Sequence, residues 1–147
     1  MTEKSKHILV AFDSSHQSQE ALKVANNMIQ EDDGHITVVQ VFENIAITSL
    51  DAMTLKELSN YANTESNEMM DLFRQRVAEV EGLDEERISF VTLEGSPKRE
   101  LVKYAKARNV DLIVMGATGT HAVERILIGS TTSYVVNHAH CNVLVVK

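Results

Sequence analysis

The sequence predicts an α/β fold, an open five-stranded parallel sheet that is doubly wound and Rossmann-like, with helices on both faces. Five short apolar runs alternate with segments whose apolar residues recur every three or four positions, as in folds where strands alternate with helices. The runs are mostly apolar, which is typical of strands covered on both faces. Right-handed crossovers then place each helix on one face or the other. For a sheet of this kind we expect the strand order 3-2-1-4-5.

The first two strands are predicted at residues 6–12 and 35–42, and the second is rich in β-branched residues. Between them we expect a helix that starts after Ser15 and that Gly34 closes. Its apolar stripe consists of Ala21, Leu22, Ala25, Met28 and Ile29. Residues 44–54 have no clear period, and we expect a loop or a loose helical turn there.

A long helix is predicted next, and Gly82 is expected to stop it in a left-handed conformation. The expected buried seam of this helix is Leu58, Tyr61, Ala62, Met69, Leu72, Phe73, Val77 and Val80.

The second half of the chain continues the alternation. Ser96 is a candidate helix cap and Pro97 suits the first helical position, so a helix is expected from there to about Arg108. A short helix is expected to begin near Ser130. The three remaining strands are predicted at residues 87–93, 110–115 and 142–146. No repeat or linker interrupts the pattern, and we therefore expect one domain over residues 1–147.

Composition limits the possible partners and the compartment. The net charge of −7 and the absence of a basic stripe disfavour nucleic acid and anionic membranes as partners. The polar residues 1–6 have no apolar signal-peptide core behind them, and no apolar run is long enough to span a bilayer. We therefore expect a cytoplasmic protein. The single cysteine, Cys141, excludes an internal disulfide and is expected to pack inertly.

Half of the six glycines fall between residues 115 and 132. In a doubly wound sheet a ligand lies at the carboxyl ends of the strands where the strand order reverses. The loops after the first strand, at Asp13, and after the fourth strand, at Gly116, therefore matter most. Gly116 and Gly119 permit positive φ and let backbone N–H groups approach an anion closely.

The segment that starts at Gly129 opens a helix, and the unpaired N–H groups of a helix N-terminus suit a phosphate. The hydroxyls of Ser130, Thr131 and Thr132 are candidate additional donors. We predict a phosphate cradle whose two ends flank a flap, in which His121 and Arg125 are the basic side chains.

Simpler interpretations stand beside this one. The glycines also suit ordinary turns and a helix start, and Asp13 also suits a cap for the following helix, together with Ser14 or Ser15. A Walker loop is excluded because no lysine lies between Lys106 and Lys147. NAD is disfavoured because the turn after the first strand has no glycine. His138 and His140 are expected at a surface or an interface rather than as metal ligands.

The glycine spacing, Gly116-x2-Gly119-x9-Gly129-Ser130, resembles the Gly-x2-Gly-x9-Gly-Ser/Thr pattern of nucleotide-binding universal stress proteins. The stretches "HILVAFDSSHQSQEAL" and "CNVLVVK" are similar to the first strand and helix and to the last strand of that family. The resemblance implies a five-stranded parallel α/β fold, a homodimer, and binding of ATP, often with a divalent metal such as Mg²⁺ or Mn²⁺.

The resemblance also implies roles for individual residues. Asp13 and Val41 would contact the adenosine end of the nucleotide, with Ala11 and Met115 beside them. Ala11 departs from the proline that several family members carry, which leaves that turn less rigid. Ribose and phosphates would be held by Gly116, Gly119, Gly129, Ser130, Thr131 and Thr132.

The expected function is an ATP-binding module of stress response or signalling with at most slow ATP hydrolysis, because no positioned base is apparent beyond Asp13. One alternative is a nucleotide-free dimeric interaction protein of the same family. Another is a phosphoryl-accepting receiver domain, which is disfavoured because Asp13 stands alone and Glu94 and Lys147 do not match the receiver pattern. We expect the homodimer to form through the apolar C-terminal edge strand, residues 143–146.

Overall fold

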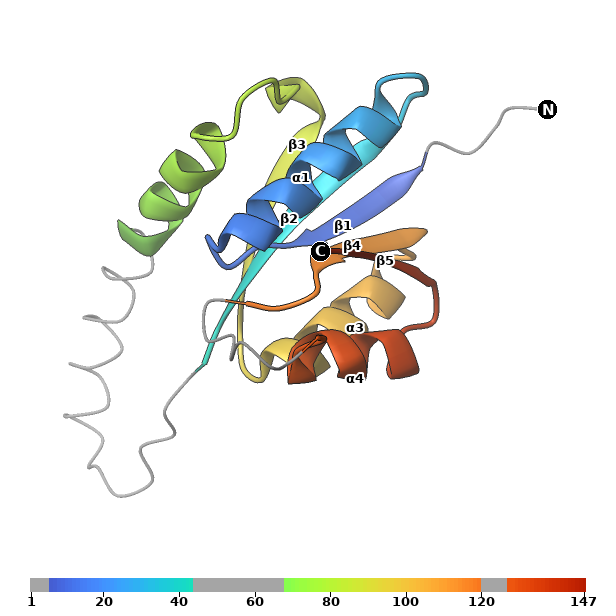
Figure 1. Cartoon of the computed structure of the whole chain (residues 1–147). Coiled ribbons are helices and arrows are strands. Elements are labelled where there is room, and N and C mark those ends of the chain that lie inside the picture. The colour runs from blue at the N-terminus through green and yellow to red at the C-terminus, as the bar shows by residue number, and fades with distance from the viewer. Residues whose placement is uncertain (1–5, 44–67, 120–126) are drawn as a thin grey trace.

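The computed structural model describes residues 6–43, 68–119 and 127–147. All neighbouring strands are parallel, and their order is β3-β2-β1-β4-β5 (Figure 1). This confirms the predicted fold class and strand order. The labelled elements are β1 (His7–Ala11), α1 (His16–Ile29), β2 (His35–Phe42), η1 (Glu85–Arg87), β3 (Ile88–Glu94), α3 (Pro97–Ala107), β4 (Leu112–Gly116), α4 (Ser130–His138) and β5 (Asn142–Val146).

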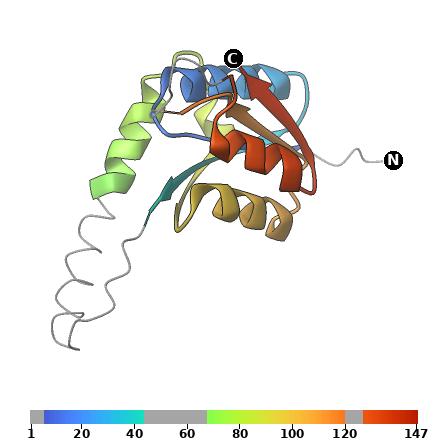
Figure 2. The same cartoon turned by 60° about the horizontal axis from the view of Figure 1, so that its bottom comes forward.

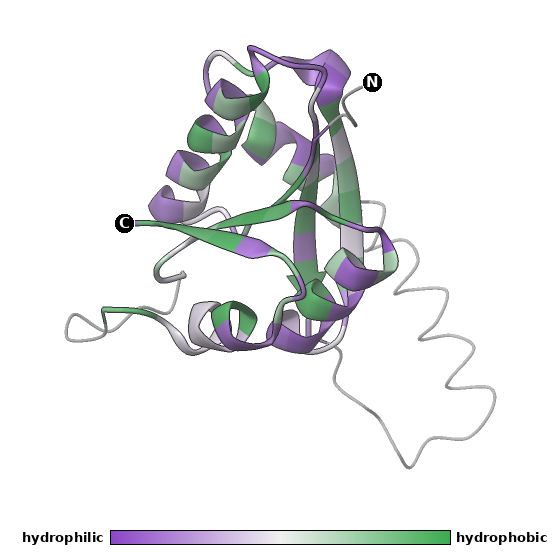
Figure 3. Cartoon of the chain, turned by 90° about the vertical axis from the view of Figure 1, so that its right-hand side faces the viewer, coloured by the Kyte–Doolittle hydropathy of each residue, from purple (hydrophilic) through white to green (hydrophobic). Residues whose placement is uncertain are grey.

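Helices cover both faces of the sheet. α1 and a helix over residues 68–78 lie on one face, and α3 and α4 lie on the other (Figures 1 and 2). The strands carry mostly hydrophobic residues, whereas hydrophilic and hydrophobic residues alternate along the helices (Figure 3), as expected for helices with one buried stripe. None of the described helices is both long and apolar enough to cross a membrane.

Successive side chains of each strand point to opposite faces of the sheet, so a separate hydrophobic core forms on each face. In β1, Ile8 and Val10 pack under α1, whereas Leu9 packs toward α3 and α4. All three side chains are fully buried. On the α1 side, the ring of Phe73 lies against Phe12 and Phe90, with ring centroids 5.8 and 5.5 Å apart. The helix over residues 68–78 is therefore anchored to the sheet by aromatic contacts.

Two predictions about the helices were wrong. α1 ends at Ile29, so Gly34 does not close it. Gly34 instead lies where a Cβ would come 2.5 Å from Ile29 Cγ2, and the close approach of this turn to the helix requires a glycine. Leu72 is 50% exposed although we placed it in the buried seam, because the stripe through Phe73 and Val77 is too narrow to include it.

Other boundary signals had mixed outcomes. Gly82 has φ of 80° and follows the helix over residues 68–78, as predicted. Pro97 opens α3 as predicted, but Ser96 makes no capping side-chain hydrogen bond although it occupies the N-cap position. The expected loop over residues 44–54 and the seam positions Leu58, Tyr61 and Ala62 lie outside the described residues.

Two histidines face each other at the amino ends of the strands. His7 and His35 are paired across β1 and β2, with ring centroids 6.0 Å apart. His7 Nε2 is 2.8 Å from the Thr37 hydroxyl, and the His7 amide donates to Asp111. Burial lowers the pKa of His7 most, and the nearby His35 and Arg108 lower it too. Asp111 and a hydrogen bond to the Arg108 backbone act in the opposite direction.

A lowered pKa makes His7 sensitive to acid. Because the folded protein disfavours the charged imidazole, the free energy of unfolding should fall as the pH drops through the unfolded value of 6.5 toward the lower folded pKa. We predict that His7→Gln loses less stability than the wild type between pH 8 and pH 5 in urea unfolding. The exposed His16 supplies the control, His16→Gln, which should retain the wild-type loss. Equal losses for His7→Gln and the wild type would contradict the prediction.

Candidate functional site

A cleft of about 570 Å³ opens at the carboxyl ends of the strands. It lies where β1 pairs with β2 on one side and with β4 on the other, the point at which the strand order reverses. The structure brings all ten residues predicted from the sequence to this cleft. They are Ala11, Asp13, Val41, Met115, Gly116, Gly119, Gly129, Ser130, Thr131 and Thr132. His121 and Arg125 lie outside the described residues.

Sequence reasoning missed eight lining residues. Val39 carried a signal, because it lies two positions before Val41 and strand residues two apart share a face. Glu43 directly follows β2 and so also lies at the carboxyl edge. Ser15 and Thr118 lie in the two loops that the sequence analysis named, whereas the remaining residues depend on tertiary packing that no local pattern indicates. The eight residues are Phe12, Ser15, Ser18, Val39, Glu43, Pro97, Leu101 and Thr118.

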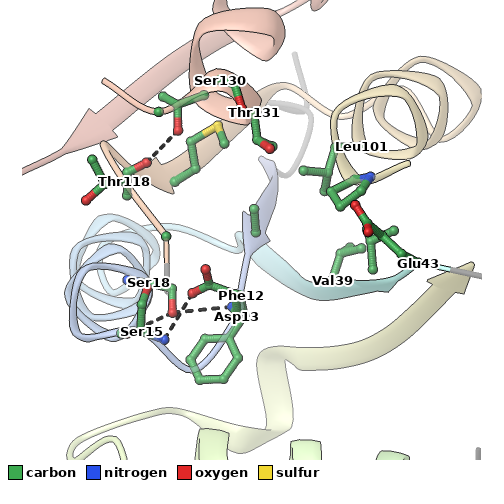
Figure 4. Close-up of a pocket in the computed structure, with 18 residues that line it drawn as sticks. Phe12, Asp13, Ser15, Ser18, Val39, Glu43, Leu101, Thr118, Ser130 and Thr131 are labelled. Atoms are coloured by element: carbon green, nitrogen blue, oxygen red, sulfur yellow. Dashed lines mark hydrogen bonds between the residues drawn. The ribbon is translucent and has the colours of Figure 1, made fainter. Parts of the chain in front are cut away.

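One end of the cleft is apolar. Val39 and Val41 come from β2, Pro97 and Leu101 from the start of α3, and Met115 from β4. Leu101 and Met115 are almost fully buried. Figure 4 shows Val39, Leu101 and Glu43 on one side of the cleft and Thr118 and Ser130 on the other. Apart from the Glu43 carboxylate, this side of the cleft is apolar and suits a flat ring, whereas the opposite side offers polar groups.

The loop after β1 is held by short polar contacts. Ser15 is the N-cap of α1, and its hydroxyl accepts from the Ser18 amide at 3.2 Å. Asp13 Oδ1 accepts from the Ser15 amide at 3.0 Å, and Ser14 has φ of 68°. A non-glycine residue in this region costs about 1 kcal/mol or more. Of the residues in the capping interpretation, Ser15 is thus the cap itself, whereas Asp13 supports the turn into α1 and also lines the cleft.

The loop after β4 is fixed by neighbours on both sides. The Ala117 amide donates to the Val146 carbonyl of β5 at 2.8 Å. The side chain of Gln17, in the first turn of α1, accepts from the Thr118 amide at 2.7 Å and from the Thr118 hydroxyl at 3.0 Å. A Cβ on Gly116 would come 2.8 Å from Gln17 Cβ. Close packing against α1 therefore requires glycine at position 116.

Positive φ is not what these glycines provide, contrary to our expectation. Among the described glycines only Gly82 and Gly95 have positive φ. At Gly119, a Cβ would lie 2.5 Å from Asp13 Oδ2, so a glycine lets this loop approach the loop after β1. At Gly129 an added Cβ would meet nothing closer than the Ala117 carbonyl oxygen at 3.5 Å, an ordinary contact. Close approach is thus the physical reason for Gly116 and Gly119, and the fold itself does not require Gly129.

The N-terminus of α4 lines the polar end of the cleft. The Gly129 amide donates to the Ala117 carbonyl at 2.7 Å, and the Ser133 amide makes the first helical bond, to Gly129, at 2.9 Å. The amides of Ser130, Thr131 and Thr132 precede that bond and have no helical acceptor. The Thr132 hydroxyl donates to the Gly116 carbonyl at 2.8 Å and is buried. The proton of this hydroxyl is therefore already used to bond the start of α4 to the end of β4.

Charge in the cleft is negative on its side chains and positive on its backbone. Asp13 and Glu43 line it, and no lysine, arginine or histidine is found among the described lining residues. The described part of the chain also contains no cluster of three His, Cys, Asp or Glu side chains able to hold a metal ion. The partial positive charge at the start of α4 and the orphan amides are therefore the groups here that attract an anion.

Comparison with known proteins agrees with this architecture. The sequence model of the universal stress protein family matches residues 4–147. A universal stress protein of Methanocaldococcus jannaschii is 38% identical over 143 residues, which cover 97% of this chain and 82% of that protein. The structure of the universal stress protein UspA from Lactobacillus plantarum superposes with a TM-score of 0.78 at 35% identity, covering 99% of this chain and 100% of that one.

Two more distant structures share the fold. A universal stress protein described in complex with cAMP superposes with a TM-score of 0.64 at 21% identity, over 97% of both chains. One from Archaeoglobus fulgidus, in complex with dAMP, has a TM-score of 0.64 at 16% identity, over 98% of both chains. The family model over residues 4–147 and the relative at 38% identity establish that the chain belongs to the universal stress protein family.

Proposed function

We propose that this chain is an ATP-binding stress-response or signalling module that holds the nucleotide in the cleft between β1 and β4. The observation that carries the proposal is the division of the cleft into an apolar end and an amide-lined end. A base would lie between Val41 of β2 and Leu101 of α3, and the phosphates would lie at the start of α4. Relatives of the same fold that hold cAMP and dAMP support a nucleotide as the ligand.

Fewer backbone amides are available to bind phosphates than the glycine motif alone indicates. The Ala117, Thr118 and Gly129 amides already donate to protein acceptors. Gly119 and the first residues of α4, Ser130 to Thr132, would therefore supply the donors. Their positions on both sides of the cleft fit an extended polyphosphate better than a single phosphate.

A divalent metal ion would bind at this phosphate site together with the nucleotide. Asp13 and Glu43 repel an uncompensated triphosphate, and Mg²⁺ typically uses one or two carboxylates together with substrate phosphates. Asp13 is the cleft carboxylate beside Gly119 and is our candidate ligand. Fast phosphoryl transfer needs a positioned base and strong charge neutralisation, and we expect binding with at most slow hydrolysis.

Calorimetry tests the function directly. Titrating the purified protein with ATP and Mg²⁺ should release heat and raise the melting temperature, because a ligand that binds only the folded state stabilises it. Adenosine titrated in parallel should bind more weakly, since it lacks the phosphates. No heat and no thermal shift at millimolar ATP would defeat the proposal.

A variant at Gly129 tests whether this segment is a phosphate cradle or an ordinary turn. Gly129 has φ of −69° and room for a Cβ, so Gly129→Val should fold while its side chain crowds the start of α4. We expect it to lower ATP affinity by about tenfold or more, the cost of losing one hydrogen bond to a charged group. Ala107→Val, at the exposed far end of α3, is the control. Wild-type ATP affinity in Gly129→Val would mean that the segment is only a turn.

We also propose that two copies pair along β5. This strand forms one edge of the sheet, and Leu144 at its centre is 36% exposed. An apolar edge strand carries unpaired backbone groups that soluble proteins normally cover. Pairing of β5 with its copy would cover both the backbone groups and the apolar side chains.

Replacing Leu144 by glutamate tests the dimer. Charges placed opposite each other across a paired edge repel, so Leu144→Glu should shift the mass measured by light scattering from dimer to monomer at micromolar concentration. Leu72→Glu is the matched control, because Leu72 is at least as exposed but lies on the helix over residues 68–78. A wild-type protein that is already monomeric, or a Leu144→Glu variant that stays dimeric, would rule out this interface.

A further inference from the structure

We infer that Gln17 is the residue that makes the cleft prefer phosphorylated nucleotides over nucleosides, by holding the loop after β4 in position. This inference rests on the proposed function and names the ligand class that the site selects. Gln17 does not line the cleft, so it acts through the loop rather than through contact with the ligand.

The contact between Gln17 and the loop spans 101 positions of the sequence. One side-chain oxygen, Oε1, accepts both the amide and the hydroxyl of Thr118, at 2.7 and 3.0 Å. The same residue fills the space beside Gly116, where a Cβ would come 2.8 Å from Gln17 Cβ. Gln17 is thus packed against the end of β4 and hydrogen-bonded to the second residue of the loop.

The position of Thr118 determines where Gly119 lies. With the Ala117 amide bonded to β5 and the Thr118 amide bonded to Gln17, the backbone is fixed at two consecutive residues. Gly119 follows directly and lies close to the Asp13 carboxylate. We take its amide as the donor that the described residues of this loop offer an anion. Without Gln17 the Thr118 amide would lose its acceptor, and the Gly119 amide that follows would no longer be held in one position.

The apolar end of the cleft does not depend on this contact. Val41, Leu101 and Met115 are positioned by β2, α3 and β4. A change at Gln17 should therefore weaken the binding of phosphates while the binding of the base stays intact. A merely structural role would instead lower thermal stability, or lower the affinity for both ligand types together.

The test compares ATP with adenosine. Gln17→Met keeps the length and packing of the side chain but removes the acceptor. We expect its ATP affinity, measured with Mg²⁺ by calorimetry, to fall about tenfold, as for the loss of a hydrogen bond at a phosphate site. Its adenosine affinity should stay within about twofold. Gln30→Met, at the other end of α1, is the matched control and should bind both ligands like the wild type.

A second variant tests whether Gln17 acts through its hydrogen bonds to Thr118. Thr118→Val removes the 3.0 Å bond but keeps the 2.7 Å amide bond, so it should lose less ATP affinity than Gln17→Met and add nothing in the double variant. An unchanged ratio of ATP to adenosine affinity in Gln17→Met, or an additive double variant, would overturn the inference. A wild type that binds neither ligand would instead refute the proposed function.

Discussion

The parallel pairing of β1 with both β2 and β4 is the constraint on which the site depends. The chain leaves β1 toward α1 on one face and leaves β4 toward α4 on the other. Because consecutive connections diverge at this one point, no backbone fills the space above the two strand ends. The cleft is thus a consequence of strand order, and the apolar strands that form the core also build its floor.

Most of the backbone groups named at the polar end of the cleft form hydrogen bonds within the protein. Ala117 bonds to β5, Gly129 bonds back to Ala117, and the buried hydroxyl of Thr132 bonds to Gly116. These bonds fasten the start of α4 to the end of β4, because buried polar groups left unpaired would destabilise the protein. Amides without such a partner lie at the helix start, where an α-helix leaves donors unused, and we propose the Gly119 amide as a further donor. The start of α4 therefore supplies part of the attraction that the cleft would offer an anion.

Much of the fold could be predicted because strand and helix periods are local. The bounds of β2 were predicted to the residue, α4 begins at Ser130, near which a helix was expected, and the glycine spacing pointed to the right loops. The reasons for the glycines were not predictable, because the neighbours that exclude a Cβ, Gln17 for Gly116 and Asp13 for Gly119, lie about a hundred residues away. Leu101 was missed for the same reason, since the packing of α3 against β2 decides that it lines the cleft.

The character of the donors also limits the chemistry of the cleft. Backbone amides and a helix terminus are fixed in place, and their charge does not change during a reaction. They would stabilise a bound triphosphate and the transition state of its hydrolysis to a similar degree, and such uniform stabilisation tightens binding without accelerating the chemical step. Faster hydrolysis would require a group that interacts with the charge formed only in the transition state. The charged groups on the described walls of the cleft, Asp13 and Glu43, are both anionic. Under the proposed function, a cleft built in this way would favour retention of a nucleotide over its turnover, as a sensor of nucleotide occupancy requires.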